Sequence, residues 1–366
     1  MGMSYVEEIK KQKLKTGFTT GTSATAAAKA GLLSIINQIK IEDVDVKLPK
    51  GSLIKIPIHL LQFNENTAKC SVIKDGGDDP DVTHGAEIIV ELSFTDKINE
   101  IDIDGGEGVG IVTKPGLGLE INKAAINPVP KKMICENLRE VVDKYNLKKG
   151  IKIIISVPKG KELGPKTDNP RLGILNGISI LGTSGIVIPF STASYAASIR
   201  QNLDVSIAMG NSTVVLTTGG RSEDYVKKII DLPEHCFVQM GDFSGYTIQQ
   251  CARKEIKKAY VVGFIGKLAK MAMGVKQTHV KGSKVDMSFL AELARKCNAN
   301  ETIIQSIKKA NTARHVSEII IENNVGGFFD EICNETYKHM RKHSEEKVEL
   351  DVILFDFDGN ILARKF

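Results

Sequence analysis

The chain lacks the features that would place it in a membrane, in an oxidising compartment or on a nucleic acid. No apolar run approaches the length needed to cross a bilayer, and residues 1–15 are charged without the apolar core of a signal peptide. The six cysteines lie far apart with no Cys-x-x-Cys pair, which argues against a structural zinc site or a disulfide framework. The formal net charge of +5 is modest and spread along the chain, so nothing indicates nucleic-acid binding. We therefore expect a cytoplasmic protein without membrane association, whose mildly basic surface suits an anionic small molecule.

The length of 366 residues and a change of pattern near Gly150 predict two domains. Residues 1–150 combine an alanine-rich helix at 25–36 with short β-branched runs, which is typical of an α+β domain with mainly antiparallel strands. In residues 151–366 strands and helices alternate, which indicates an α/β, Rossmann-like domain with a parallel sheet. This second domain is predicted to contain a first strand at 151–157, a helical segment at 287–343 and a final strand at 352–357. The oligomeric state stays open, a homo-oligomer included.

Residues 75–88 hold the densest group of functional side chains. Four aspartates, a histidine and three glycines follow an apolar run that ends at Ile73. Glycine and proline disfavour a helix, and clustered carboxylates are costly to bury, so we expect an exposed loop between two strands. Loops with this composition often carry function, although a solvated acidic turn would give the same pattern.

Glycines are concentrated in a second segment and recur after two predicted strands. Residues 105–119 contain six glycines, which would let a backbone approach a ligand closely, although hairpin turns would also explain them. In a parallel sheet, ligands bind beyond the carboxyl ends of the strands. Thr217–Gly220 and Met240–Asp242 follow such strands and are predicted adenosine or nucleotide sites, with Asp242 placed for ribose hydroxyls. Strand-to-helix turns need glycine in any α/β protein, so a purely structural role stays open.

Two segments are similar to known motifs, but each lacks a part that its motif requires. Residues 177–184 have the glycine spacing of a Walker A loop, but Thr183 stands where the phosphate-binding lysine would be. Asp356–Gly359 resembles the nucleophile loop of haloacid-dehalogenase phosphatases, yet that loop requires a whole following domain and only seven residues follow Gly359. We interpret this last motif as a strand followed by a turn with exposed acids.

Taken together, these segments resemble one family, the CbiD proteins of anaerobic cobalamin biosynthesis, which are cobalt-precorrin-5B carbon-1 methyltransferases. The matching stretches are TGFTTGTSATAAAKA (16–30), KDGGDDPDVTHGAEI (74–88), GGEGVGIVTKPGLGL (105–119), INPVPKKMI (126–134), NPRLGILNGISILGTSGIVIPFS (169–191) and TTGGRSE (217–223). The resemblance covers essentially the whole chain. It implies methyl transfer from S-adenosylmethionine to carbon 1 of a cobalt-bound tetrapyrrole, giving cobalt-precorrin-6A. It also implies that the protein binds no metal of its own, because the cobalt belongs to the substrate.

In the light of this resemblance, the residue types predict three groups of site residues. For the carboxylates of the substrate we expect basic and hydroxyl side chains, with one acid that orients them: Thr19, Thr20, Thr22, Lys74, Asp81, Lys114 and Arg171. For the methyl donor we expect Gly106, Gly108, Gly110, Thr218, Gly219, Gly220, Gly241 and Asp242. The catalytic candidates are Asp78, Asp79, His84 and His279. The two aspartates, like Asp81, would orient hydrogen-bond donors, accept ring N–H bonds or steady the sulfonium charge, and His84 or His279 would take a proton.

Three other functions stay open at this point. A metal-dependent hydrolase would use Asp75, Asp78, Asp79 and His84 as ligands, and chelators would abolish its activity. A nucleotide-binding oxidoreductase would bind a nicotinamide cofactor in the second domain. A tetrapyrrole carrier or scaffold would bind the macrocycle and turn nothing over.

Overall fold

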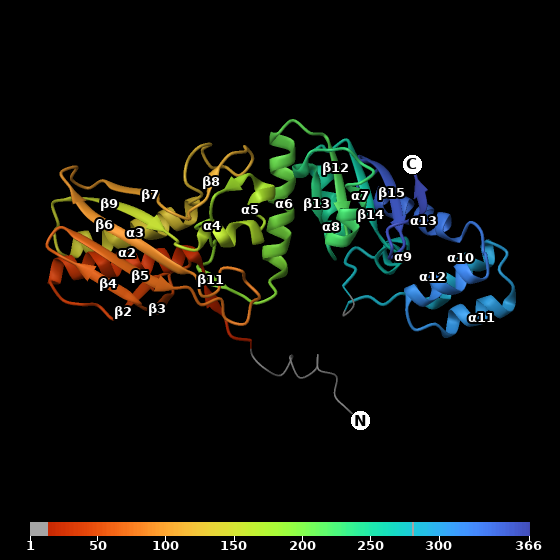
Figure 1. Ribbon diagram of the computed structural model, residues 1–366, viewed down its shortest axis with the longest axis horizontal. Helices are drawn as coiled ribbons and strands as arrows, with labels where there is room; N and C mark the ends of the chain where they lie inside the picture. Colours follow the sequence, from red (N-terminus) through yellow and green to blue (C-terminus); the bar gives the residue numbers. More distant parts are fainter. Residues whose placement is uncertain (1–13, 280–281) are drawn as a thin grey trace, which may run out of the picture. The chain divides into compact units, whose positions relative to one another are not determined.

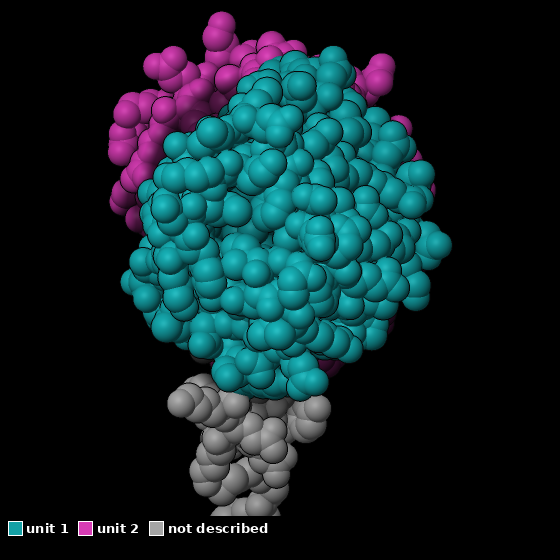
Figure 2. Space-filling view, turned by 90° about the vertical axis from the view of Figure 1, so that its left-hand side faces the viewer, with its two compact units in different colours: residues 1–192 teal, residues 193–366 magenta. Residues whose placement is uncertain are grey.

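The computed structural model describes residues 14–279 and 282–366, and the chain divides into two units between Thr192 and Ala193 (Figures 1 and 2). Each unit contains a sheet of five strands and its own buried apolar core. No helix in the described part of the chain has both the length and the apolar character needed to cross a membrane.

The first unit is built on a sheet with the strand order β4-β5-β6-β9-β7. Its strands are β4 (Leu60–Phe63), β5 (Thr67–Ile73), β6 (Glu87–Thr95), β7 (Ile101–Gly105) and β9 (Gly150–Ser156). The pairs from β4 to β9 are antiparallel, and β7 runs parallel to β9. Alternate residues of β5 and β6, such as Cys70 and Val90, are buried because one face of the sheet is covered by helices.

Two helices, α2 (Thr20–Asn37) and α3 (Pro128–Lys144), cover that face and pack on each other (Figure 1). Helix α2 is rich in alanine, and Gly31 faces Ala68 and Cys70, so its backbone approaches the sheet closely. The unit also contains three small antiparallel pairs and short helices. These are β1 (Gly17–Phe18) with β11 (Ile186–Val187), β8 (Ile111–Val112) with β10 (Ile174–Leu175), β2 (Asp43–Lys47) with β3 (Leu53–Pro57), α4 (Gly160–Leu163), η1 (Gly164–Lys166) and α5 (Asn169–Leu172).

The second unit has the strand order β13-β12-β14-β15-β16, in which the first four strands are parallel and β16 is antiparallel. The strands are β12 (Thr213–Thr217), β13 (Phe237–Gln239), β14 (Lys258–Phe264), β15 (Glu349–Phe355) and β16 (Ile361–Lys365). Val214 and Leu216 enter one core and Val215 enters the other, because successive side chains of a strand point to opposite faces. The helices are α6 (Thr192–Ala208), α7 (Gly220–Val226), η2 (Glu234–Cys236), α8 (Ser244–Arg253), α9 (Ile265–Ala272), α10 (Met287–Lys296), α11 (Glu301–Lys309), α12 (Ala313–Glu322) and α13 (Phe328–His343).

The coarse expectation from the sequence is confirmed: antiparallel strands dominate the first unit, and the second carries a mixed sheet that ends with a C-terminal strand. The expected domain boundary near residue 150 is corrected to 192. The run at 151–157 was expected to open the second sheet, but it forms β9, which lies between β6 and β7 in the first. A continuous apolar run does not reveal which sheet it joins, since any central strand reads this way.

Candidate functional site

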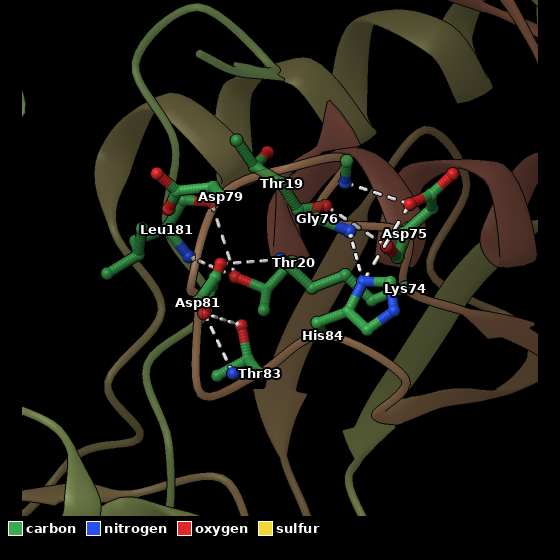
Figure 3. A network of polar contacts seen from close by, with 12 residues as sticks. Thr19, Thr20, Lys74, Asp75, Gly76, Asp79, Asp81, Thr83, His84 and Leu181 are labelled. Atoms are coloured by element: carbon green, nitrogen blue, oxygen red, sulfur yellow. Dashed lines mark hydrogen bonds and ion pairs between the residues drawn. The ribbon is translucent and has the colours of Figure 1, made fainter. Parts of the chain in front are cut away.

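The aspartate-rich segment forms the loop between β5 and β6, and its Asp81 is the partly exposed counter-ion of the buried Lys74 (Figure 3). One Asp81 carboxylate oxygen lies 2.7 Å from the Nζ of Lys74, whose side chain is only 2% exposed. The other oxygen accepts hydrogen bonds from the Thr83 N–H at 2.7 Å and the Thr83 hydroxyl at 2.6 Å. Burial alone would raise the Asp81 pKa, but Lys74 and Thr83 outweigh it and lower the pKa. Both predicted substrate ligands of this pair are therefore committed to each other inside the loop.

Two further aspartates of the loop bind backbone N–H groups of distant segments. Asp78 accepts from the N–H of Lys15 at 2.6 Å, and Asp79 accepts from the N–H of Phe190 at 2.8 Å. Phe190 has a left-handed backbone with φ of +55°, a costly conformation for an aromatic residue, and Asp79 helps to hold it. These carboxylates have a structural role that the sequence did not reveal.

The remaining acid of the loop, Asp75, lies beside His84. Asp75 accepts from the Gly77 N–H at 2.8 Å and pairs with the Lys15 Nζ at 2.6 Å, and the Lys15 hydrogen bond is the main cause of its lowered pKa. The Nδ1 of His84 accepts the N–H of Gly76 at 2.9 Å and lies 3.7 Å from an Asp75 oxygen. The His84 side chain is 56% exposed, so its imidazole is accessible to a ligand.

The threonines at the N-terminus of α2 hold the chain segment 179–185 against the helix. Thr20 Oγ1 accepts from the Leu181 N–H at 2.9 Å and donates toward the Ser179 carbonyl at 3.1 Å. Thr19 caps the helix by accepting from the Thr22 N–H, and the Thr22 hydroxyl donates to the Gly185 carbonyl at 2.7 Å. All three side chains are buried, with at most 6% exposed. Their hydroxyls bind internal partners in this structure, and their binding of substrate carboxylates stays a prediction.

The glycines of the segment 105–119 allow chains to pack closely. A Cβ on Gly106 would collide with Ser156, and one on Gly110 with Ile174. Gly108 has a φ of +72°, and its Cβ would collide with the Val157 carbonyl. Neighbouring chain fills the space next to these glycines, which explains their presence without the close approach of a ligand that the sequence suggested.

Lys114 and Arg171, far apart in the sequence, are brought together in the first unit. The stem of Lys114 packs against Gly173, and its Nζ donates to the Arg171 carbonyl at 3.3 Å. The hydroxyl of Thr113 fixes the same junction by donating to the Gly173 carbonyl at 2.7 Å. Both cationic side chains remain partly exposed, so this is the pair of predicted anion ligands that the fold gathers at one place.

In the second unit, the carboxyl ends of β12 and β14 meet at glycines that face open space. Nothing lies within 4 Å of a Cβ built on Gly219 or Gly266, and the one neighbour of Gly220 is the Gln239 side-chain nitrogen at 3.9 Å. Thr218 joins the two strands, because its N–H donates to the Val262 carbonyl at 3.1 Å. Gly219 has φ of 162°, an extended backbone that any residue adopts, so the backbone itself does not require glycine here.

Asp242, at the end of β13, is occupied by protein partners. Its carboxylate pairs with Lys267 and accepts the Thr278 hydroxyl at 3.0 Å. Burial alone would raise the Asp242 pKa, but Lys267, Thr278 and the nearby His279 outweigh it and lower the pKa. Asp242 therefore forms an ion pair with Lys267, and its contact with a ribose stays a prediction. The next residue back, Gly241, packs under the hydroxyl of Tyr195, so its surface is covered.

The ligand set of the metal-dependent alternative is not assembled. Within residues 14–279 and 282–366, no group of three or more His, Cys, Asp or Glu side chains is placed to hold a metal ion. The aspartates of the loop point instead to Lys15, Lys74 and Phe190, as described above.

Comparisons with known proteins place this architecture in a family. A family model described as CbiD matches residues 7–189, and one described as CbiD, C-terminal domain, matches residues 277–366. A cobalt-precorrin-5B C(1)-methyltransferase from Priestia megaterium is 44% identical over 98% of both chains. The chain belongs to the CbiD family. A cobalt-precorrin-5B C(1)-methyltransferase from Geobacillus kaustophilus is 48% identical over 88% of this chain and 87% of its own. The crystal structure of the cobalamin biosynthesis protein CbiD from Archaeoglobus fulgidus is 30% identical, covers 71% of this chain and 80% of that chain, and has a TM-score of 0.39.

Several residues at the carboxyl edge of the second sheet of this CbiD-family chain were missed in the sequence analysis. Gly266 lies two residues after the end of β14, as Gly219 lies two residues after β12, so the position of Gly266 and Lys267 after a strand was an available signal. Arg221 and Phe357 also lie at this edge, and no sequence pattern connects them because 136 residues separate them.

Proposed function

We propose that the chain transfers a methyl group from S-adenosylmethionine to carbon 1 of cobalt-precorrin-5B, giving cobalt-precorrin-6A in anaerobic cobalamin biosynthesis. The observation that carries this proposal is the relationship to the Priestia megaterium protein of that name, at 44% identity over 98% of both chains. The substrate is a small molecule with many carboxylates, and its cobalt is part of the substrate. A formal net charge of +5 suits such an anion.

The methyl donor binds at the carboxyl edge of the second, Rossmann-like sheet. The chain passes from β12 to β13 on one side and then to β14 and β15 on the other, and ligands bind where the strand order reverses in this way. Gly219, Gly220 and Gly266 leave open space at this edge, which fits a bound adenosyl group. S-adenosylmethionine supplies the methyl group from its positively charged sulfonium sulfur. The donor binds against Thr218 and these glycines.

His279 holds the proton that methylation releases. Transfer of a methyl cation to a neutral ring carbon adds one positive charge to the macrocycle, and loss of a proton restores its charge. The lowered pKa of Asp242 keeps its carboxylate ionised at neutral pH, and this carboxylate lies close enough to His279 for the two side chains to interact electrostatically. Lys267 and Thr278 fix Asp242, so they position the group that supports His279.

Lys114 and Arg171 bind carboxylates of the macrocycle. Both side chains are cationic, both are partly exposed, and the Lys114 Nζ lies 3.3 Å from the Arg171 carbonyl oxygen. An arginine fork and a lysine point charge on neighbouring stretches of chain suit a ligand that carries several carboxylates. Lys74, Thr19, Thr20 and Thr22 instead maintain the loop and helix that frame this unit.

The experiment is a methylation assay with cobalt-precorrin-5B and S-adenosylmethionine labelled in its methyl group. The expected product is a macrocycle that carries one labelled methyl group, located at carbon 1 by NMR, together with one equivalent of S-adenosylhomocysteine. The Priestia megaterium relative, run alongside, establishes that the substrate preparation is competent. If that relative methylates the substrate while this folded protein binds it and transfers nothing, the proposal fails and a carrier role replaces it.

A further inference from the structure

The turn that follows β15 is built around the Asp356 carboxylate. Its Oδ1 accepts the N–H groups of Asp358 at 2.9 Å and Asn360 at 2.8 Å, and its Oδ2 accepts the Asn360 side-chain amide at 2.7 Å. Burial alone would raise the Asp356 pKa, but these hydrogen bonds outweigh it and lower the pKa. Gly359 closes the turn with φ of +97°. The Asp356 carboxylate therefore has partners within the turn, and the adjacent residue of this turn is Phe357.

Phe357 helps to fix the guanidinium of Arg221. Phe357 stacks on Phe264, the last residue of β14, with ring centroids 5.0 Å apart and planes 10° apart. The Arg221 Cζ lies 5.5 Å from the Phe264 centroid and 5.9 Å from the Phe357 centroid. The Arg221 Nη2 donates to the Phe357 carbonyl at 2.6 Å, and the Tyr225 hydroxyl donates to the same oxygen at 3.1 Å. Two aromatic faces and one hydrogen bond thus hold the guanidinium, while it remains exposed.

This guanidinium adjoins the open glycines. Arg221 directly follows Gly219 and Gly220, and Phe264 lies two residues before Gly266. Neither the extended backbone of Gly219 nor any neighbouring atom requires glycine at that position. Open space and a fixed, exposed cation therefore occur together at one sheet edge, and they are independent observations.

We propose that Arg221, held by Phe264 and Phe357, binds the carboxylate of a small molecule that occupies this edge. A planar guanidinium that is already oriented loses little freedom when it forms paired hydrogen bonds with a carboxylate. The proposal rests on the methyltransferase function above, which offers two sources of this group. One is the amino-acid carboxylate of the methyl donor, and the other is a side-chain carboxylate of the macrocycle.

The test compares S-adenosylhomocysteine with 5′-methylthioadenosine by calorimetry. Methylthioadenosine keeps the adenosine and the thioether but lacks the amino-acid carboxylate. If the donor is the source, Arg221→Gln should weaken binding of S-adenosylhomocysteine by about ten- to a hundred-fold and leave methylthioadenosine unchanged. Arg221→Lys should recover only part of the loss, because it keeps the charge but not the fork. Phe357→Leu should weaken binding in the same direction and less strongly.

The macrocycle is tested in parallel through the KM for cobalt-precorrin-5B. If the macrocycle is the source, Arg221→Gln should raise this KM about tenfold or more while the preference for S-adenosylhomocysteine persists. The matched control is Arg364→Gln, which removes an arginine on β16 whose Cζ lies 4.9 Å from the Phe366 ring centroid, and it should change neither quantity.

Failure of the two proposals is distinguishable. If the wild-type protein methylates its substrate and the folded Arg221→Gln variant matches it in both binding measurements and KM, the carboxylate site is overturned and the methyltransferase function stands. If the wild-type protein does not methylate, the proposed function fails instead. In that case the carboxylate site would still be supported if the wild-type protein binds S-adenosylhomocysteine more tightly than 5′-methylthioadenosine and Arg221→Gln abolishes this difference.

Discussion

Removal of the Asp81 charge is the sharpest test of the loop architecture, because it leaves the amine of Lys74 buried without its counter-ion. Lys74 has a side chain only 2% exposed and lies 2.7 Å from the Asp81 carboxylate, which is 24% exposed. Breaking a buried pair by removing one partner costs about 3–5 kcal/mol, and the partial exposure of Asp81 places the expected cost of Asp81→Asn near the lower end. Asparagine can still accept from Thr83, so the change isolates the ionic contact.

The matched control lies on β5 and β6, the two strands that this loop connects. Lys69 and Glu91 form a pair at 2.8 Å with side chains 47% and 54% exposed, so Glu91→Gln should cost about 0–1 kcal/mol. Lys74→Met combined with Asp81→Asn should be less destabilising than Asp81→Asn alone, since no buried charge is then left unpaired.

Thiol labelling of Cys70 in increasing urea is a suitable assay, because the chain has two units and a global signal would mix their transitions. Cys70 is fully buried in β5, and burial raises the pKa of its thiol to about 12, so it reacts only when the first unit opens. The lowered pKa of Asp81 gives stability that is present above its unfolded pKa and is lost as the pH falls through its folded pKa. The difference between wild type and Asp81→Asn should therefore shrink in acid. Equal midpoints for Asp81→Asn and Glu91→Gln at neutral pH would refute the reasoning.

Three further outcomes follow from the same contacts. Gly108→Ala should lower the melting temperature of the first unit, because the new Cβ collides with a carbonyl group. Gly219→Ala should keep the wild-type melting temperature and weaken S-adenosylhomocysteine binding. Identical behaviour of the two variants in melting and calorimetry would contradict this. Thr20→Val should lower the free energy of unfolding by about 1–3 kcal/mol, because the Leu181 N–H loses its buried acceptor, and a wild-type urea midpoint would speak against it. His279→Asn should lower kcat for methyl transfer at constant KM, because the released proton loses its acceptor; an unchanged kcat would exclude His279.

The sequence predicted local features better than distant partners. The loop between β5 and β6 and the turn after β15 are confirmed, because glycine, proline and clustered acids restrict the backbone locally. The partners of the loop aspartates could not be predicted, since Asp78 binds Lys15 and Asp79 binds Phe190 across 63 and 111 residues. A carboxylate that satisfies a backbone N–H and one that awaits a substrate look alike in a sequence.

The role of a glycine is also difficult to predict from the sequence. Gly108 and Gly219 are both glycines after a strand, yet the first packs against Val157 and the second faces open space. Only the fold distinguishes a glycine required by its neighbours from one that leaves room for a ligand. The boundary at 192 could not be predicted from the sequence either, because the apolar run of β9 is compatible with a central position in either sheet.

A crystal structure of the protein with S-adenosylhomocysteine tests most directly where the methyl donor binds. We predict that the adenosyl group lies at the carboxyl edge of the second sheet, over Thr218–Gly220 and beside Gly266. S-adenosylhomocysteine bound in the first unit, against the glycines at 105–110, would contradict the account.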